Sequence, residues 1–203
     1  LKEVGLAESR IFDRAMVERA EQELKRQYLS QGYYAVEFKT TITPLERNRV
    51  AINFTVVEGE IARIKQINII GNKVYSESEL LDLFALTTPG MFTWYTGNDK
   101  YSKQKLSGDL EKLRSHYLDH GYIEFTIDST QVSISQDKQD IYISVSLTEG
   151  NQYTVSNVRL NGDLVLPDDE LISLVQLKPG QVFSRERMTE TTKAISDRLG
   201  NDG

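Results

Sequence analysis

Two stretches decide the fold of this chain: KRQYLSQGYY at Lys25–Tyr34 and RSHYLDHGYI at Arg114–Ile123, nearly the same phrase 89 positions later. A long fixed period of this kind indicates tandem copies of one supersecondary unit. The segments on either side of each phrase therefore define the repeat.

Each phrase closes a segment with the apolar spacing of an α-helix. Before the second phrase, apolar residues recur at intervals of three and four, which is one face of a helix: Leu106, Leu110, Leu113 and Tyr117. Gly121 then supplies a left-handed C-terminal cap. In the first copy only Glu21 departs from the pattern in kind, and Ala20 covers part of the gap. A third copy of this helix is predicted over Phe183–Leu199.

Two extended runs follow each helix. They are Tyr34–Thr43 and Val50–Gly59 in the first copy, and Tyr122–Ser135 and Ile141–Gly150 in the second. Apolar and polar residues alternate, which predicts strands with one buried face. The connectors are short, so each pair is predicted to form a β-hairpin.

Both hairpins end in Glu-Gly, and a further strand and a short helix follow each. These are predicted at Ile61–Asn72 and Ser76–Leu86, and again at Tyr153–Asp163 and Pro167–Leu177. The unit is therefore β-α-α-β-β, about 90 residues long, with a three-stranded sheet on two helices. The fold class is α+β.

Only the middle unit is whole. Residues 1–60 hold a unit without its first strand, residues 61–150 a complete unit, and residues 151–203 a unit without its C-terminal hairpin. The links between units are so short that bending is expected to be small and centred on two hinge residues, Gly59 and Gly150.

Composition narrows the class of protein. The 203 residues include 39% hydrophobic and 27% charged residues, carry a net charge of −6 and contain no cysteine. This argues against nucleic acid as a partner and excludes disulfides and thiolate metal sites. The chain has no apolar run long enough to span a bilayer and no signal-peptide pattern. We expect it to be a segment of a longer protein.

The pattern and several long stretches resemble POTRA (polypeptide-transport-associated) repeats. IKQINIIGN at Ile64–Asn72 resembles their opening strand, and TPLERNRVAINFTVVEG at Thr43–Gly59 the end of a second repeat. Tyr101–Ser135 and the aromatic loop MFTWYTGNDKY at Met91–Tyr101 resemble the third repeat of factors that fold β-barrels into bacterial outer membranes. The chain would then hold part of repeat two, all of repeat three and part of repeat four, with the membrane barrel missing.

The resemblance implies a periplasmic scaffold, the soluble part of an outer-membrane protein in the β-barrel assembly machinery. Its partners would be unfolded outer-membrane proteins, accessory lipoproteins of the assembly complex and periplasmic chaperones, with no cofactor. The modules alone do not distinguish this from a POTRA segment of a secretion or translocation transporter.

In a β-α-α-β-β unit the first strand is expected to pair with the last, which leaves Tyr122–Ser135 outermost. Its unpaired N–H and C=O groups could receive an extended peptide by β-augmentation. A bulge is expected at Asp128–Thr130. The side chains of Phe125 and Ile127 could face the helices and not a bound peptide, and the sequence leaves this open. The candidate protein-binding residues are Phe125, Thr126, Ile127, Asp128, Val132, Ser133 and Ile134.

A second surface is implied by the resemblance, where the family docks a lipoprotein of β-propeller form, BamB-like. Its candidates here are Leu86, Thr87, Val132 and Ile134. Phe84 is expected in the core because of its helical spacing with Leu80 and Leu81.

Catalysis has little support. His116 and His120 lie four apart on one helix, but no third ligand is supplied nearby, so we expect a surface pair and no metal site. No nucleotide-binding, metalloprotease or EF-hand motif occurs. An RNA-binding KH module is also disfavoured because its Gly-x-x-Gly loop is missing and the chain is acidic.

One loop remains to be placed. Its aromatic and apolar residues are expected to pack over the helices of their own module, although an exposed patch is the alternative: Met91, Phe92, Trp94 and Tyr95.

Overall fold

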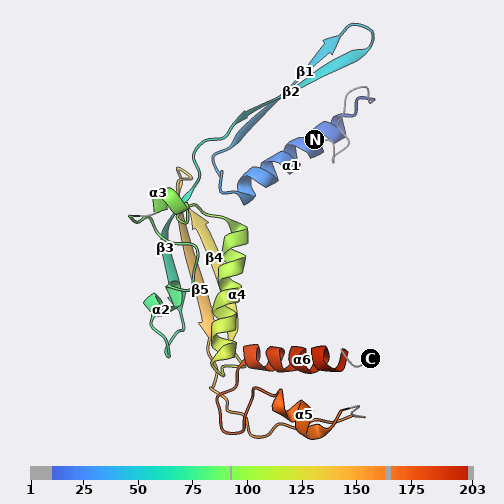
Figure 1. Cartoon of the computed structure of the whole chain (residues 1–203). Coiled ribbons are helices and arrows are strands. Elements are labelled where there is room, and N and C mark those ends of the chain that lie inside the picture. Colours follow the sequence, from blue (N-terminus) through green and yellow to red (C-terminus); the bar gives the residue numbers. More distant parts are fainter. Residues whose placement is uncertain (1–10, 92, 163–165, 201–203) are drawn as a thin grey trace. The chain divides into compact units, whose positions relative to one another are not determined.

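The computed structural model describes residues 11–91, 93–162 and 166–200 (Figure 1). Its elements are α1 (Arg14–Ser30), β1 (Glu37–Leu45), β2 (Arg49–Val57), β3 (Arg63–Ile70), α2 (Glu77–Leu81), α3 (Thr93–Thr96), α4 (Lys103–Asp119), β4 (Thr126–Ile134), β5 (Asp140–Thr148), α5 (Asp168–Ser173) and α6 (Arg185–Gly200). The chain divides into two compact units, residues 1–67, 85–108 and 132–143 in one and residues 68–84, 109–131 and 144–203 in the other.

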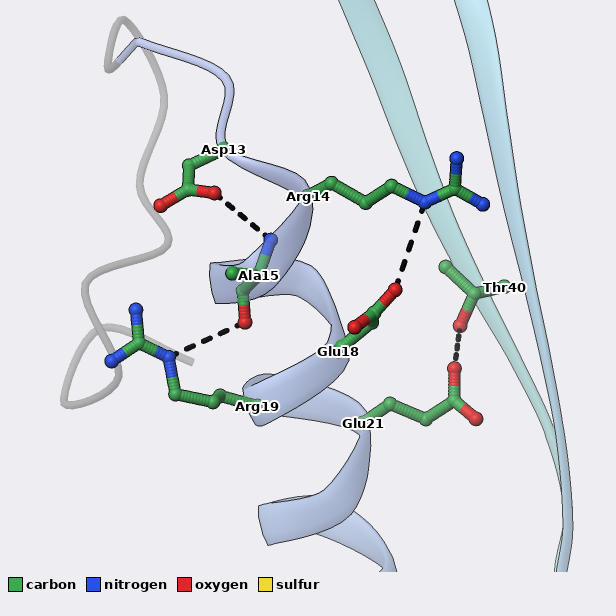
Figure 2. Close-up of polar contacts among 7 residues, drawn as sticks. All are labelled: Asp13, Arg14, Ala15, Glu18, Arg19, Glu21 and Thr40. Carbon is green, nitrogen blue, oxygen red and sulfur yellow. Dashed lines mark hydrogen bonds and ion pairs between the residues drawn. The ribbon is translucent and has the colours of Figure 1, made fainter.

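Helix α1 begins at a side-chain cap and is tied to the first hairpin. Asp13 accepts a hydrogen bond from the backbone N–H of Ala15 at 2.9 Å, and an N-cap of this kind satisfies a donor that the helix leaves unpaired. Glu21, the residue that departs from the apolar stripe, accepts a hydrogen bond from the Thr40 hydroxyl of β1 at 2.5 Å (Figure 2). The departure is therefore a polar link between helix and strand.

Strands β1 and β2 form an antiparallel hairpin, as predicted, with Glu37 opposite Val57 and Leu45 opposite Arg49. The turn between them holds Arg47 at φ 60°. Apolar residues of β2 are half-buried at every second position, which is the alternation read from the sequence.

The middle module has a three-stranded sheet in the order β3-β5-β4, so β4 is outermost, as predicted. The arrows in Figure 1 show β3 and β5 running in one direction and β4 in the other. The sheet is therefore mixed, and β5 is its central strand.

Strand β5 and the helices supply the core of this module. Ile141, Ile143, Val145 and Leu147 are buried, which confirms the alternation along β5. Phe84 is also buried, as expected. The other large buried apolar residues of the module are Ile64, Ile67, Ile69, Leu80, Leu86, Tyr101, Leu106, Leu113, Tyr117, Tyr122 and Phe125.

One predicted strand is wrong. Residues 153–162 of the predicted strand Tyr153–Asp163 form no strand, only an isolated bridge between Thr154 and Val182. The prediction rested on likeness to β3, which lies beside a long central strand. No such strand lies beside this segment among the described residues. The helices α5 and α6 do form where the repeat predicts them.

Candidate protein-interaction edge

Strand β4 is an edge strand with one partner. It lies beside β5 in the sheet order, and no backbone hydrogen bond links Thr126–Ile134 to any other element in the part of the chain that the structure describes. Along nine residues its outer N–H and C=O groups therefore face away from the sheet. Such an edge is a template for pairing with another chain.

The predicted side chains of this edge divide into two groups. Phe125 is buried and stacks on Tyr117 with ring centroids 4.2 Å apart, and Ile127 is half-buried. The question left open by the sequence is thus answered for Phe125, whose ring belongs to the core. The exposed candidates are Thr126, Asp128, Val132, Ser133 and Ile134.

Asp128 is held to its own hairpin. It accepts hydrogen bonds from the hydroxyls of Thr148, at 2.7 Å, and Thr126, at 2.8 Å. These bonds hold the pKa of Asp128 below its usual value. The strand runs through Asp128–Thr130 without a break, and the bulge expected there stays a prediction.

The second predicted surface loses one member. Leu86 is buried at 1% exposure, so its side chain belongs to the core. The reason is that the chain turns back after α2, where the N–H of Thr87 bonds to the carbonyl of Asn98 at 3.0 Å. Val132 and Ile134 are exposed at 40% and 39%, and Thr87 is half-buried.

The repeated phrase builds a joint that the sequence did not reveal. The carbonyl of Gly32 accepts the N–H of Ala62 at 2.9 Å, and the carbonyl of Ala62 accepts the N–H of Tyr101 at 3.1 Å. The rings of Tyr34 and Tyr101 lie 6.0 Å apart, and burial, with the neighbouring Tyr101, raises the pKa of Tyr34 to about 12. Ala62, near the start of the middle module, is thus bonded on both sides.

The same joint recurs after the second phrase. The carbonyl of Gly121 accepts the N–H of Tyr153 at 2.8 Å, and the carbonyl of Tyr153 accepts the N–H of Phe183 at 3.0 Å. Gly121 has φ 88°, and a Cβ there would lie 2.8 Å from the carbonyl oxygen of Tyr153. The glycine is therefore required both by its left-handed conformation and by this close approach. The recurrence of the phrase was the signal for this joint, but no single residue type in it predicts the bonds.

The Glu of each Glu-Gly pair also has a partner in the phrase. Glu149 is buried and accepts hydrogen bonds from the Tyr117 hydroxyl at 2.8 Å and the Val74 N–H at 3.1 Å. Glu58 accepts the same bond from Tyr28 at 2.9 Å, at an exposed position. The carboxylate thus fastens the end of the hairpin to the end of the helix.

The predicted hinge glycines sit beside these fastenings. Gly59 and Gly150 have φ 70° and 73°, and a Cβ would lie 2.9 Å from the Cβ of Ala35 at the first and 2.8 Å from that of Glu124 at the second. Both positions therefore require glycine. Their role as hinges stays a prediction.

The histidine pair belongs to an aromatic cluster. The rings of His116 and His120 lie 4.4 Å apart, and the edge of Tyr75 contacts both. His120 Nδ1 lies 2.7 Å from the carbonyl oxygen of His116. The described residues contain no group of three or more metal-ligating side chains.

The predicted packing of the aromatic loop is wrong for two of its residues. Met91 and Tyr95 are each 82% exposed, and Tyr95 lies within the short helix α3. Phe92 and the side chain of Trp94 lie outside the described residues. No helix in the described part of the chain has the length and apolar character needed to cross a membrane.

Comparison with known proteins gives the family. The model of the POTRA family, described as a surface antigen variable number repeat, matches residues 1–59, 62–150 and 153–203. The chain belongs to the POTRA family. The tandem β-α-α-β-β interpretation is thereby confirmed.

The relatives share one name. The chain is 35% identical over 204 aligned positions to the outer membrane protein assembly factor BamA of Neisseria meningitidis, covering all of this chain and 26% of that protein. It is 26% identical to BamA of Buchnera aphidicola, of which it covers 33%. The chain thus spans about a quarter to a third of these relatives.

A solved structure shows the same fold. The crystal structure of Haemophilus influenzae BamA POTRA3-5 matches with a TM-score of 0.56 at 22% identity, over 95% of this chain and 72% of that one. The likeness of this chain to the POTRA repeats of BamA is therefore present in both sequence and fold.

Proposed function

We propose that the chain is a periplasmic segment of an outer-membrane protein assembly factor and receives unfolded barrel precursors by β-augmentation at β4. The observation that carries this is the open edge of β4, which pairs only with β5. The sequence likeness to the assembly factors supplies the class of client. Unfolded barrel precursors differ in sequence but share extended strands, and backbone pairing does not read side chains.

The energetics suit transient holding. Each added backbone hydrogen bond contributes about 0.5–1.5 kcal/mol net, so a nine-residue edge binds weakly by itself. The first hairpin offers β1 as a second edge, since β2 is the partner of β1 among the described residues. Two weak edges on one chain raise the effective concentration of a captured strand without trapping it.

The test is photo-crosslinking in living cells from the full-length protein. A photoreactive residue at Ser133 on β4 is expected to capture unfolded outer-membrane proteins, and one at Glu111, exposed on α4, is the matched control. Equal capture at the two positions, or none at Ser133, would contradict the proposal. Capture of secreted proteins in place of outer-membrane proteins would support the transporter alternative.

The accessory surface is proposed around Val132, Ile134 and Thr87, with a lipoprotein of the assembly complex as partner. Exposed β-branched side chains near the end of an edge strand suit an apolar contact. Val132→Arg with Ile134→Arg is expected to keep the fold and to reduce lipoprotein co-purification. Ile42→Arg on β1, where Ile42 is similarly exposed, is the control, and equal retention by both variants would count against this surface.

A further inference from the structure

We infer that the middle POTRA module closes the outer edge of its own first strand, β3, so that strand addition is confined to the opposite edge of the sheet. The sheet of the middle module has two edges, β3 and β4. They differ in how their backbone groups are used. This inference rests on the proposed β-augmentation and adds which edge is selected and how.

The start of β3 is covered by the segment before α4, residues Asp99–Tyr101, here called the edge cover. The N–H of Ile64 bonds to the carbonyl of Asp99 at 2.7 Å, and the N–H of Tyr101 to the carbonyl of Ala62 at 3.1 Å. An antiparallel bridge joins Arg63 to Lys100 between these bonds. The cover therefore occupies the groups that an incoming strand would use.

An ion pair fixes the cover to the strand. The Asp99 carboxylate is fully buried and its Oδ2 pairs with the guanidinium of Arg63. The other carboxylate oxygen, Oδ1, is buried without a hydrogen-bond partner. The ion pair thus joins the cover to β3, at the free-energy cost of one buried carboxylate oxygen without a donor.

The far end of β3 is closed by different means. The N–H of Ile69 donates to the Glu77 carboxylate of α2 at 2.8 Å. Buried positions fall at Ile64, Ile67 and Ile69, and the step of three in a strand of period two indicates a β-bulge at Lys65 and its neighbour. Bulges and exposed lysines are known devices against pairing at an edge.

The third module repeats the cover with a much shorter connector. There the N–H of Val155 bonds to the carbonyl of Gln181 at 2.8 Å, the N–H of Phe183 to the carbonyl of Tyr153 at 3.0 Å, and a bridge joins Thr154 to Val182. The bonds are the same, although this connector lacks the aromatic loop. The bonding pattern of the cover therefore does not depend on the aromatic loop, although the segment bonded here forms no strand.

Strand β4 carries no such cover. Its sequence, TIDSTQVSI, contains no lysine and no proline, and no backbone bond from a described element other than β5 reaches it. One edge is thus closed at both ends while the other is left open. Incoming strands are accordingly expected to add at one edge of the sheet, beside β4.

The test uses the whole chain and a synthetic probe, a biotinylated nine-residue peptide of alternating valine and threonine. Photoreactive residues are placed at Lys65 on β3 and Ser133 on β4. In the wild-type chain we expect capture from Ser133 at least fivefold above that from Lys65. Asp99→Ala with Glu77→Ala removes the two carboxylates that close the edge of β3, so capture at Lys65 is expected to rise at least fivefold. The variant is expected to fold because Arg63, the partner of Asp99, is half-exposed.

The control variant, Asp82→Ala with Asp137→Ala, removes two carboxylates elsewhere and is expected not to raise peptide capture at Lys65. Equal capture at Lys65 and Ser133 in the wild-type chain would overturn edge closure and leave β-augmentation standing. No capture at Ser133 would contradict the proposed function, whereas a gain at Lys65 in the opened variant would still support the cover. No such gain in a folded variant would overturn it.

Amide hydrogen exchange in the wild-type chain decides the matter if the opened variant fails to fold. The amides of Ile64 and Ile69 are expected to exchange at least tenfold more slowly than the outward amides of β4. Equal rates would overturn the proposal, because the cover would then protect nothing.

Discussion

The two copies of the Tyr–Glu bond offer a matched pair for one mutational test. Tyr117→Phe removes the hydroxyl that donates to Glu149, and Tyr28→Phe removes the equivalent donor to Glu58. The bond lengths are 2.8 and 2.9 Å, so geometry is nearly constant. The two sites differ in burial, since Tyr117 and Glu149 are buried and Tyr28 and Glu58 are not, and Glu149 also accepts the Val74 N–H.

The expected magnitudes follow from that difference. A hydrogen bond to a charged group contributes about 1.5–3 kcal/mol when buried, and removal of the donor leaves a buried carboxylate oxygen with an unsatisfied acceptor site. Tyr117→Phe keeps the ring and its stacking on Phe125, so the lost bond dominates. We expect a decrease of about 2 kcal/mol in the free energy of unfolding. Tyr28→Phe should cost about 0.5 kcal/mol or less, because water replaces the hydroxyl.

Urea unfolding measures both variants. The only tryptophan of the chain, Trp94, lies in the sequence of the middle module and serves as a fluorescence probe, and far-ultraviolet circular dichroism follows the secondary structure of the whole chain. With an m value of about 1.5 kcal/mol/M, a loss of ~2 kcal/mol lowers the midpoint by about 1.3 M. A double-mutant cycle of Tyr117→Phe with Glu149→Gln isolates the pair. Equal effects of the two Tyr→Phe changes would refute the reasoning, because burial would then not decide the cost.

Three further predictions concern the helix ends. Burial, together with the neighbouring His120, lowers the pKa of His116 in the folded protein. At acidic pH the unfolded chain therefore binds more protons than the folded one. The free energy of unfolding should fall as the pH drops below about 6.5, the pKa of histidine in an unfolded chain. His116→Gln should reduce that slope in urea titrations between pH 7.5 and about 5.5; an unchanged slope would contradict this. Gly121→Ala should lower the free energy of unfolding by at least about 1–2 kcal/mol, because the backbone there is left-handed. Gly108→Ala within α4, where nothing lies within 4 Å of the added Cβ, should raise it by about 0.5–1 kcal/mol. Thermal unfolding that shifts in the same direction for both variants would contradict this prediction. Ser76→Ala removes a capping box and should cost ~1 kcal/mol, seen as faster amide exchange in α2, and unaltered exchange would argue that packing alone holds this helix.

The parts of the fold that were predicted correctly are those with a local signature. The helix stripe ending in Tyr117, the alternation along β5 and the short connectors each announce one element within about ten residues. The outermost place of β4 follows from one further rule, the pairing of first and last strands. Periodicity predicted the buried side chains best along β5, where every second residue lies in the core.

The parts that were missed depend on pairings far apart in the chain. Nothing near Ile64 indicates that Asp99 will bond to it, and nothing near Leu86 shows that the chain turns back over it. The segment after Tyr153 has a strand-like sequence, but a strand also needs a neighbour, and none lies beside it among the described residues. Alternation states what a segment prefers, whereas pairing decides what it becomes.

The repeated phrase can now be understood as one helix end with two functions. Its tyrosine donates to the glutamate that ends its own hairpin, and its glycine offers a carbonyl to a backbone N–H near the start of the next module. Closure of one module and attachment of the next therefore use residues only a few positions apart. A change that loosened the tyrosine would loosen the joint as well, because both contacts depend on where this helix ends. The phrase recurs because each link in the tandem array needs the same two contacts at the same place.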